Sequence, residues 1–307
     1  MTAYKNDASV LEALIALVER DRIHEQENMS DHTSLRIGGP ADYFIDVETE
    51  EELGKLLRFL TKEEIPHLLV GNGSNLLFLD EGYRGVILHL TGDFQIIKRS
   101  GDTVTVGAAR LLSSLAQFVC REGLSGLEPL SGIPGTVGGA VYMNAGAYGG
   151  ETKDVVGSVN LMARDGSYVR ACAAEEMAFA YRHSVVQESG EIVLSATYYL
   201  KPDEEEAIRE RMNEFRKRRN AKQPVELPSA GSTFKRPEGA YAAALIEEAG
   251  LKGLRIGGAE VSEKHSGFLV NVDHATAADF LALMDEVARR VYENSGFRLE
   301  PEVRIIR

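Results

Sequence analysis

The sequence predicts an α+β protein with a domain boundary near residue 200. Helix-like and strand-like patterns alternate along all 307 residues, a length sufficient for two or three domains. The composition changes at Lys201, where a strongly charged helix follows, and this change places the boundary. The hydrophobic fraction of 44% and the charged fraction of 26% are those of ordinary soluble globular proteins.

Apolar periodicity and capping residues predict the individual elements. Thr49 begins a helix, because Glu52 stands three residues later as in a capping box. The pair Asp165-Gly166 predicts the tip of a hairpin. The expected helices are 8–20, 49–60, 111–121, 173–180, 202–220, 240–249 and 277–295. The expected strands are 35–37, 67–70, 85–90, 94–99, 103–107, 159–163, 168–171, 191–200, 255–261, 268–271 and 297–306.

Charge and cysteine content exclude several classes of function. A net charge of −13 argues against a general nucleic-acid or anionic-membrane binder, which needs a basic surface. The two cysteines, Cys120 and Cys172, fit a reducing compartment. No apolar run approaches the ~18 residues of a membrane span, and no metal-ligand spacing occurs among the seven histidines. We therefore expect a cytoplasmic protein with no metal, no nucleic-acid partner and no membrane partner.

A glycine-rich stretch from Leu124 to Gly150 is the strongest sign of a ligand site. It contains eight glycines and two prolines, and glycine lets a ligand come close to the backbone. Successive amides in such a segment can form a concavity that binds phosphate, and Ser131, Thr136 and Asn144 add short polar side chains. The alternative is a mobile surface loop. The apolar residues within the stretch favour a buried, ligand-lined segment.

A second glycine-rich segment, Gly71 to Asn75, follows an expected strand. A dinucleotide fingerprint would need a third glycine at position 76, where this chain has Leu76. The residues after it look strand-like, which argues against a Rossmann helix. A turn between strands that offers N–H groups to phosphate fits the segment better.

Three polar residues are candidates for chemistry, although each has a simpler explanation when taken alone. Arg182 follows Tyr181 at a junction, where arginine is more often solvated or ion-paired. Ser232 lies among small residues, where serine is more often a cap or turn residue. Glu302 lies in the expected last strand and needs a partner only if its carboxylate is partly buried. Lys222 alone reads as a surface lysine in a linker.

Taken together, these motifs closely resemble the UDP-N-acetylenolpyruvoylglucosamine reductase family. The resemblance covers nearly the whole chain and rests on specific motifs in the expected order. They are Thr33-Ser34-Leu35-Arg36-Ile37-Gly38-Gly39, Val70-Gly71-Asn72-Gly73-Ser74-Asn75-Leu76, Ser131–Gly149, Tyr181-Arg182-His183-Ser184 and Ala230-Gly231-Ser232-Thr233-Phe234-Lys235, with Glu300-Pro301-Glu302-Val303-Arg304 at the end.

The resemblance implies a fold and a reaction. It implies an FAD-binding region of the vanillyl-alcohol-oxidase (PCMH) type at 1–200, with subdomains of about 1–67 and 68–200. A smaller α+β substrate domain at 201–307 would follow, with its last strand returning to the active site. The resemblance also implies that the protein is monomeric and that it acts in peptidoglycan precursor synthesis. NADPH would reduce non-covalent FAD, flavin N5 would deliver hydride to C3 of UDP-N-acetylglucosamine enolpyruvate, and Ser232 would protonate C2.

The resemblance also implies the residues of the site. Arg182, Ser232 and Glu302 would be catalytic, and the substrate would contact Tyr181, Arg182, Lys222, Gly231 and Ser232. The implied FAD contacts are Ile37, Gly38, Val70, Gly71, Asn72, Gly73, Ser74, Asn75, Leu76, Ser131, Gly132, Ile133, Pro134, Gly135, Thr136, Gly138, Gly139, Ala140, Asn144, Ala145, Gly146 and Ala147.

This chain departs from some relatives in two places, and two other functions compete with the implied one. The connection between Ser184 and Ile192 is too short for the tyrosine-bearing loop that some relatives close over uridine, so this chain resembles the subclass without it. Arg236 stands where some relatives have Asn, which leaves a nucleotide contact there in doubt. The competing functions are another FAD-dependent oxidoreductase of the same fold, and a non-catalytic nucleotide-binding protein.

Overall fold

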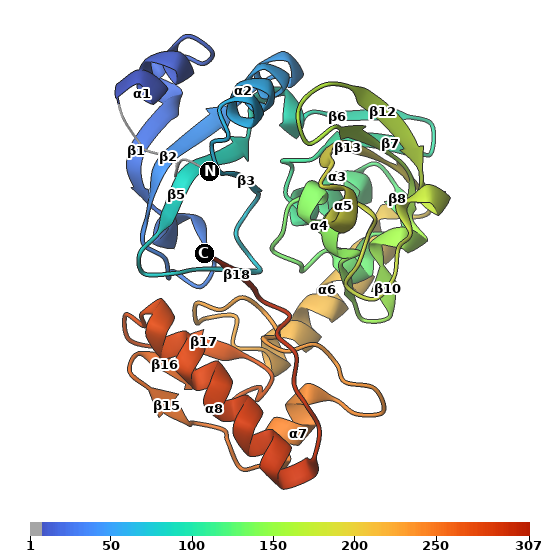
Figure 1. The fold of residues 1–307 in the computed structure, drawn as a ribbon. Helices are drawn as coiled ribbons and strands as arrows, with labels where there is room; N and C mark the ends of the chain where they lie inside the picture. Colours follow the sequence, from blue (N-terminus) through green and yellow to red (C-terminus); the bar gives the residue numbers. More distant parts are fainter. Residues whose placement is uncertain (1–7) are drawn as a thin grey trace. The chain divides into compact units, whose positions relative to one another are not determined.

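The computed structural model of the protein describes residues 8–307, which form two compact units. Unit 1 comprises the described part of Met1–Glu25 with Tyr43–Asn72 and Gly85–Lys217, and unit 2 comprises Gln26–Asp42, Gly73–Arg84 and Arg218–Arg307. Both units mix helices and strands, which confirms the predicted α+β class (Figure 1). The predicted functional domains, 1–200 and 201–307, do not follow these contact boundaries and remain a prediction.

Unit 1 is built around two sheets, although β1, β2 and β5 each continue into a segment of unit 2. The first sheet has the order β1-β2-β5-β3 and the second, antiparallel sheet has the order β12-β11-β13-β7-β6. In the first sheet the strands are β1 Ile23–Asn28, β2 Pro40–Val47, β3 His67–Val70 and β5 Tyr83–Leu90. In the second sheet they are β6 Ile97–Ser100, β7 Thr103–Gly107, β11 Val156–Met162, β12 Val169–Ala173 and β13 Ile192–Tyr199. Short pairs complete the unit: β8 Leu124–Ser125 with β14 Lys201–Pro202, and β9 Gly146–Ala147 with β10 Gly150–Glu151.

The helices of unit 1 pack their apolar faces into one core that both sheets share. In α2 (Glu50–Lys62), the core residues are Leu53, Leu56, Leu57 and Leu60, at the spacing of one helical face. Thr49 caps this helix by accepting from the amide of Glu52, as predicted. The carboxylate of Glu52 accepts from the amide of Glu48, so the predicted capping box forms only in part. The other helices are α1 Ala8–Ile15, α3 Leu112–Arg121, α4 Val137–Met143 and α5 Val186–Ser189.

Unit 2 has its own core between α8 (Ala277–Ser295), α7 (Ala242–Glu248) and a three-stranded antiparallel sheet (Figure 1). The sheet has the order β15-β16-β17, with β15 Arg255–Ile256, β16 Ala259–Val261 and β17 Leu269–Asn271. Helix α8 has the bounds that the sequence predicts, because Thr276 caps its start and Gly296, at φ 76°, ends it. A parallel pair, β4 Leu76–Phe78 with β18 Arg304–Ile306, joins early and late segments of this unit.

Several expected elements differ from the structure. Residues 35–37 form no strand, since Leu35 and Ile37 instead bury their side chains in the core of unit 2. The last strand is only Arg304–Ile306, because the residues before it pair with the segment after Ser232. The helix expected at 173–180 is a 3₁₀ turn, Ala174–Met177.

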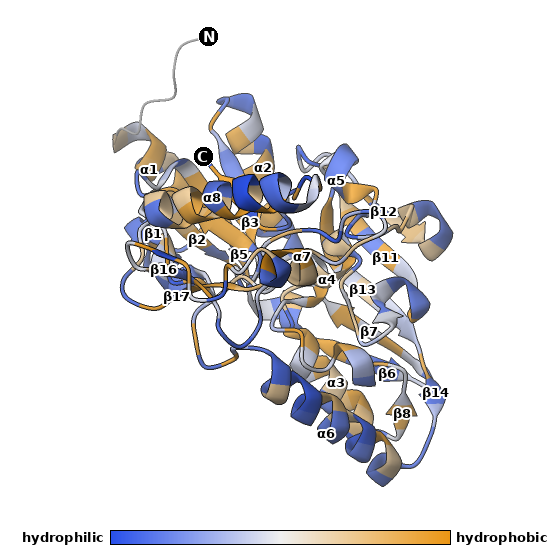
Figure 2. Cartoon of the chain, turned by 90° about the horizontal axis from the view of Figure 1, so that it is seen from below, coloured by the Kyte–Doolittle hydropathy of each residue, from blue (hydrophilic) through white to orange (hydrophobic). Residues whose placement is uncertain are grey.

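The charged helix α6 runs from Glu205 to Lys222, slightly later than expected, and it is mostly hydrophilic (Figure 2). Within 8–307, no helix is both long and apolar enough to span a bilayer.

Candidate active site

Two glycine-rich loops meet within unit 1. The side chain of Asn72 donates to the carbonyl of Pro134 (2.6 Å), which ties the loop after β3 to the loop before α4. A Cβ on Gly71 would lie 2.5 Å from the hydroxyl of Thr136, so these loops approach too closely for any residue but glycine. Thr136 in turn caps α4 by accepting from the amide of Gly139 (3.3 Å). Asn72 and Pro134 lie 62 positions apart in sequence, and the fold brings their segments into contact.

The loop before α4 presents amides that the protein does not use. Within the described part of the chain, the N–H groups of Gly132, Gly135 and Thr136 have no acceptor. By contrast, Val137 and Gly138 donate to the carbonyls of Arg110 and Ala108 (2.8 Å each). Free amides in a glycine-rich turn are the donors that phosphate oxygens take. The loop at 132–136, rather than the first turn of α4, therefore offers the donors for an anion.

Asn144 is one of the predicted FAD contacts, and its side chain is fully engaged within the protein. It is 1% exposed and caps α4 in the left-handed conformation, with φ 42°. Its amide donates to Glu151 (3.0 Å) and to the carbonyl of Ala180 (2.9 Å), and its oxygen accepts from the amide of Lys153. Its side chain thus fastens the segments that surround it, and a flavin contact at this position stays a prediction.

Arg182 lies in unit 1 in an unusual turn. Ala180 and His183 exchange both backbone hydrogen bonds (3.2 Å each), so Tyr181 and Arg182 are the two central residues of a tight turn. Arg182 has φ 56°, a left-handed conformation that such turns normally give to glycine or asparagine. Its guanidinium lies 5.2 Å from the centre of the Tyr181 ring, a cation–π contact.

Ser232 and Glu302 belong to segments that pair within unit 2. The amide of Lys235 donates to the carbonyl of Glu300, and the amide of Glu302 donates to the carbonyl of Thr233 (2.8 Å each). The side chain of Asn75 also donates to the carbonyl of Glu302 (3.1 Å). Thr233 and Glu302, which lie 69 positions apart in sequence, are thereby brought next to each other, and the predicted FAD contact Asn75 also bonds Glu302.

Thr233 anchors this arrangement, and sequence analysis did not single it out. It is fully buried; its amide donates to the carbonyl of Gly267 (2.9 Å), and its hydroxyl accepts from the amide of Leu269 (3.2 Å). The one feature of the sequence that points to Thr233 is its position directly after Ser232. Gly231, just before Ser232, has φ 76° with open space where a Cβ would lie.

The remaining predicted residues have varied surroundings. Lys222 is the exposed last residue of α6. Ile37 is 2% exposed in the core of unit 2, while Gly38 lies where a Cβ would be 2.9 Å from that of Phe78. Arg236 stacks on the ring of Tyr241 at 4.0 Å, which gives its side chain a partner inside unit 2. The FAD and substrate contacts predicted at these positions stay predictions.

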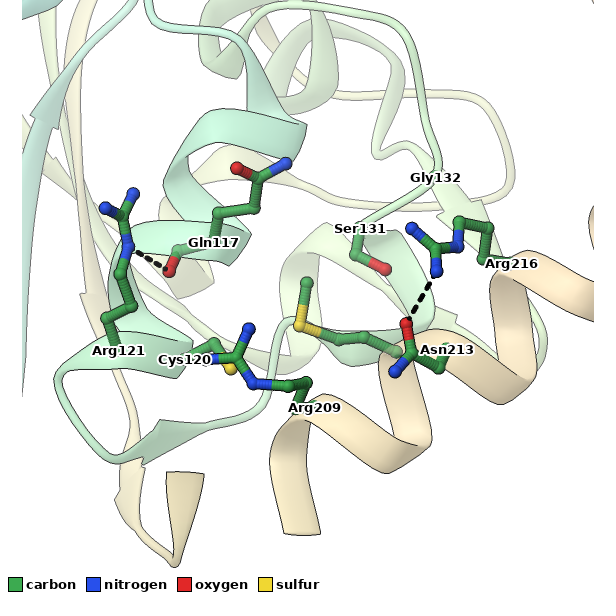
Figure 3. Close-up of a pocket in the computed structure, with 9 residues that line it drawn as sticks. Gln117, Cys120, Arg121, Ser131, Gly132, Arg209, Asn213 and Arg216 are labelled. Carbon is green, nitrogen blue, oxygen red and sulfur yellow. Dashed lines mark hydrogen bonds between the residues drawn. The ribbon is translucent and has the colours of Figure 1, made fainter. Parts of the chain in front are cut away.

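Unit 1 also contains a cavity of about 450 Å³ beside the glycine-rich loop (Figure 3). Ser131 and Gly132 line it on one side, and α3 and α6 line the others. Arg216 donates to the side chain of Asn213 (2.9 Å), and burial raises the pKa of the Cys120 thiol, which stays neutral. The lining residues are Gln117, Cys120, Arg121, Ser131, Gly132, Arg209, Met212, Asn213 and Arg216. Three of these residues are arginines. Arg209 pairs with Glu205, and the positive charge of Arg121 and Arg216, in a protein of net charge −13, favours an anion near the loop.

Comparisons with known proteins agree on one family. Residues 223–306 match the model of the UDP-N-acetylenolpyruvoylglucosamine reductase C-terminal domain, and residues 41–171 match an FAD binding domain. The reductase of that name from Lachnoclostridium phytofermentans is 46% identical over 97% of both chains. The one from Clostridioides difficile is 44% identical over 98% of this chain and 99% of its own.

Solved structures give the same result. The crystal structure of UDP-N-acetylenolpyruvylglucosamine reductase from Thermus caldophilus has a TM-score of 0.80 and 42% identity, and covers 93% of this chain and 98% of its own. An alkyldihydroxyacetonephosphate synthase shares the fold alone, with a TM-score of 0.50 and 14% identity. Together with the FAD-domain match, these likenesses confirm the predicted flavin-binding fold of the vanillyl-alcohol-oxidase type.

Proposed function

This chain belongs to the UDP-N-acetylenolpyruvoylglucosamine reductase family and is an FAD-dependent oxidoreductase, and we propose that it reduces UDP-N-acetylglucosamine enolpyruvate to UDP-N-acetylmuramate. The family acts in peptidoglycan precursor synthesis. NADPH is the proposed reductant, and the cytoplasm is the proposed location.

The glycine-rich loops of unit 1 suit the diphosphate of FAD. The free amides of Gly132, Gly135 and Thr136 are donors of the required kind, and the close approach of Gly71 to Thr136 fixes the loop that carries them. When bound, FAD supplies the hydride chemistry, which no side chain can provide. The protein's part is to position the enolpyruvyl group and to control charge and protons.

Three residues have proposed roles at the substrate. Arg182 binds the enolpyruvyl carboxylate through charge-assisted hydrogen bonds and stabilises the enolate that forms when hydride adds to C3. Glu302, in its protonated form, donates a hydrogen bond to the same enolate. Ser232 then donates its hydroxyl proton to C2. Lys222 contacts the diphosphate as a point charge, and Tyr181 and Gly231 complete the proposed substrate contacts.

The observation that carries this proposal is the pairing of the Ser232 segment with the Glu302 segment in unit 2. The carbonyl of Thr233, next to Ser232, accepts from the amide of Glu302 itself (2.8 Å). The pairing brings the segment of the proposed proton donor next to the segment of the proposed acid, and a proton donor positioned near an enolate suits its protonation. Neither the spacing in sequence nor the composition requires this arrangement.

The test is to titrate the purified protein anaerobically with NADPH and then with UDP-N-acetylglucosamine enolpyruvate, while its visible absorption spectrum is recorded. We expect a yellow protein that NADPH bleaches and that UDP-N-acetylglucosamine enolpyruvate re-oxidises. Re-oxidation by oxygen alone would indicate another FAD-dependent oxidoreductase of the same fold. A colourless protein that FAD does not reconstitute would contradict the proposal.

A further inference from the structure

The turn that carries Arg182 needs external support. A left-handed arginine costs on the order of one kcal/mol relative to glycine at such a position, and it persists only where its surroundings hold it. A two-residue turn bonded only between Ala180 and His183 leaves the carbonyls of its central residues free to rotate. The structure must therefore contain groups that fix the turn from outside.

Two amide side chains fix it, one on each side. Asn144 donates to the carbonyl of Ala180 (2.9 Å), and Gln187 donates to the carbonyl of Arg182 (3.0 Å). Gln187 also donates to the carbonyl of Tyr142 at the end of α4 (2.7 Å). One amide group thus joins Arg182 to α4, the helix that follows the glycine-rich loop.

We propose that Gln187 is a positioning residue that sets the conformation of Arg182 for the carboxylate of the substrate. This inference rests on the proposed function, because it takes Arg182 as the carboxylate-binding group. Gln187 itself touches no reacting atom. It acts by holding the carbonyl of Arg182, and with it the left-handed φ that aims the side chain.

Ser184 provides a matched control within the same motif. Its hydroxyl donates to the same carbonyl of Tyr142 (2.8 Å), but it makes no bond to Arg182. Both residues thus help hold the end of α4, but of these two only Gln187 also holds the turn. A purely structural role for Gln187 predicts equal effects of the two substitutions, whereas a positioning role predicts different ones.

The test compares Gln187→Met, which keeps the side-chain length without the donors, with Ser184→Ala. Both half-reactions are measured by stopped flow on FAD-loaded protein. For Gln187→Met we expect flavin reduction by NADPH to be unchanged and re-oxidation by the enolpyruvyl substrate to slow roughly 10- to 100-fold, as for a misplaced catalytic group. For Ser184→Ala we expect both rates to stay near those of the unmodified protein.

Hydrogen exchange provides a readout that does not depend on activity. The amide of His183 donates to the carbonyl of Ala180, so it reports on the turn directly. Its exchange should become faster in Gln187→Met and remain slow in Ser184→Ala. Equal exchange and equal rates in the two variants would overturn the inference.

Arg182→Met separates this inference from the proposed function. If Arg182→Met leaves re-oxidation unchanged, the proposed role of Arg182 fails, and the role of Gln187 fails with it. If Arg182→Met slows re-oxidation while Gln187→Met does not, the proposed function stands and only the positioning role is refuted. If both variants lose FAD, Gln187 has a general structural role and the inference is wrong.

Discussion

The two units hold their candidate catalytic residues by different kinds of interaction. In unit 1, side-chain amides of Asn144 and Gln187 fasten the turn that carries Arg182. In unit 2, backbone hydrogen bonds between residues 233–235 and 300–302 hold the segment that follows Ser232 against the segment that contains Glu302. Side-chain bonds vanish with one substitution, whereas backbone bonds survive it. Single substitutions at neighbouring residues should therefore displace Arg182 more readily than they displace Ser232.

The largest effect is expected for Ser232→Ala in unit 2, which tests the chemical role of the side chain without disturbing the backbone around it. Ser232→Ala removes the proposed proton donor but none of the backbone bonds around it. Re-oxidation of reduced flavin by the enolpyruvyl substrate should slow by ~10²–10⁴-fold, the usual contribution of a positioned proton donor. FAD content and thermal unfolding should match those of the unmodified protein. A variant with near-normal re-oxidation would remove Ser232 from the mechanism.

A methyl group at Gly71 tests how tightly the loops of unit 1 are packed. The new Cβ would lie 2.5 Å from the hydroxyl of Thr136, so the cap of α4 must move. We expect Gly71→Ala to lower the free energy of unfolding by about 1–3 kcal/mol and to weaken FAD binding measurably. Chemical denaturation and flavin fluorescence titration measure the two effects.

Gly54→Ala is the control for this change. Gly54 lies within α2, and its closest neighbour is the side-chain end of Arg58 at 3.2 Å, which donates to the carbonyl of Gly166 and needs to move by only a few tenths of an ångström. Alanine there should be neutral or should stabilise by roughly 0.5–1 kcal/mol, because it favours a helix. A large loss of stability in Gly54→Ala, or none in Gly71→Ala, would contradict this account of the loop contact.

Thr233→Val asks whether the backbone pairing in unit 2 tolerates the loss of a buried anchor. The hydroxyl accepts from the amide of Leu269, which would be left without its acceptor. We expect about 1–3 kcal/mol less stability, as for a buried unpaired donor, with the re-oxidation rate close to normal. A catalytic loss as large as that of Ser232→Ala would mean that the side chain of Thr233, not the backbone, aligns the site.

The smallest expected effect concerns Glu128, which begins the segment leading to the glycine-rich loop. Burial acts to raise the pKa of this carboxyl, but hydrogen bonds from Arg211, Gly126 and Ser125 outweigh it and lower the pKa below its usual value. Its stabilising effect is therefore complete above its unfolded pKa of ~4.3 and is lost as the pH falls through the lower folded pKa.

Glu128→Gln should remove this pH dependence. At pH 7 the variant should be less stable by about 1 kcal/mol, since the guanidinium of Arg211 is partly exposed and its ion pair is screened. The difference should shrink as both proteins are titrated below pH 4.5. Urea unfolding at a series of pH values measures it, and a constant difference at every pH would exclude the ionised form as the cause.

Local signals predicted the longer helices well but missed the short helices α4 and α5, and the failures have physical causes. Helix α8 could be read directly, because Thr276 and Gly296 mark its ends and its apolar residues recur at helical spacing. The segment at 35–37 has strand-like residues. In the structure, Leu35 and Ile37 are buried in the core of unit 2, although the segment does not pair with any strand. Local composition cannot reveal such burial.

The sequence predicted the candidate site residues, but it did not predict the contacts that hold them in place. The motifs identify Arg182 and Ser232, whereas nothing in the sequence indicates that Arg182 takes a left-handed conformation, which arginine rarely adopts. The partners that impose it, Asn144 and Gln187, lie 38 residues before and 5 residues after it. The pairing of Glu302 with Thr233 likewise depends on contacts far apart in sequence.

The discontinuity of unit 2 affects how the chain acquires its structure during synthesis. Segments Gln26–Asp42 and Gly73–Arg84 emerge first, but the rest of their unit begins only at Arg218. At ordinary translation speeds they wait on the order of ten seconds or more. During that time β4 lacks its partner β18, and Asp80 lacks the α8 amides of Ala277 and Ala278. Truncation after residue 303 would thus leave an early strand unpaired, and chaperone dependence should concentrate in the N-terminal part of the nascent chain.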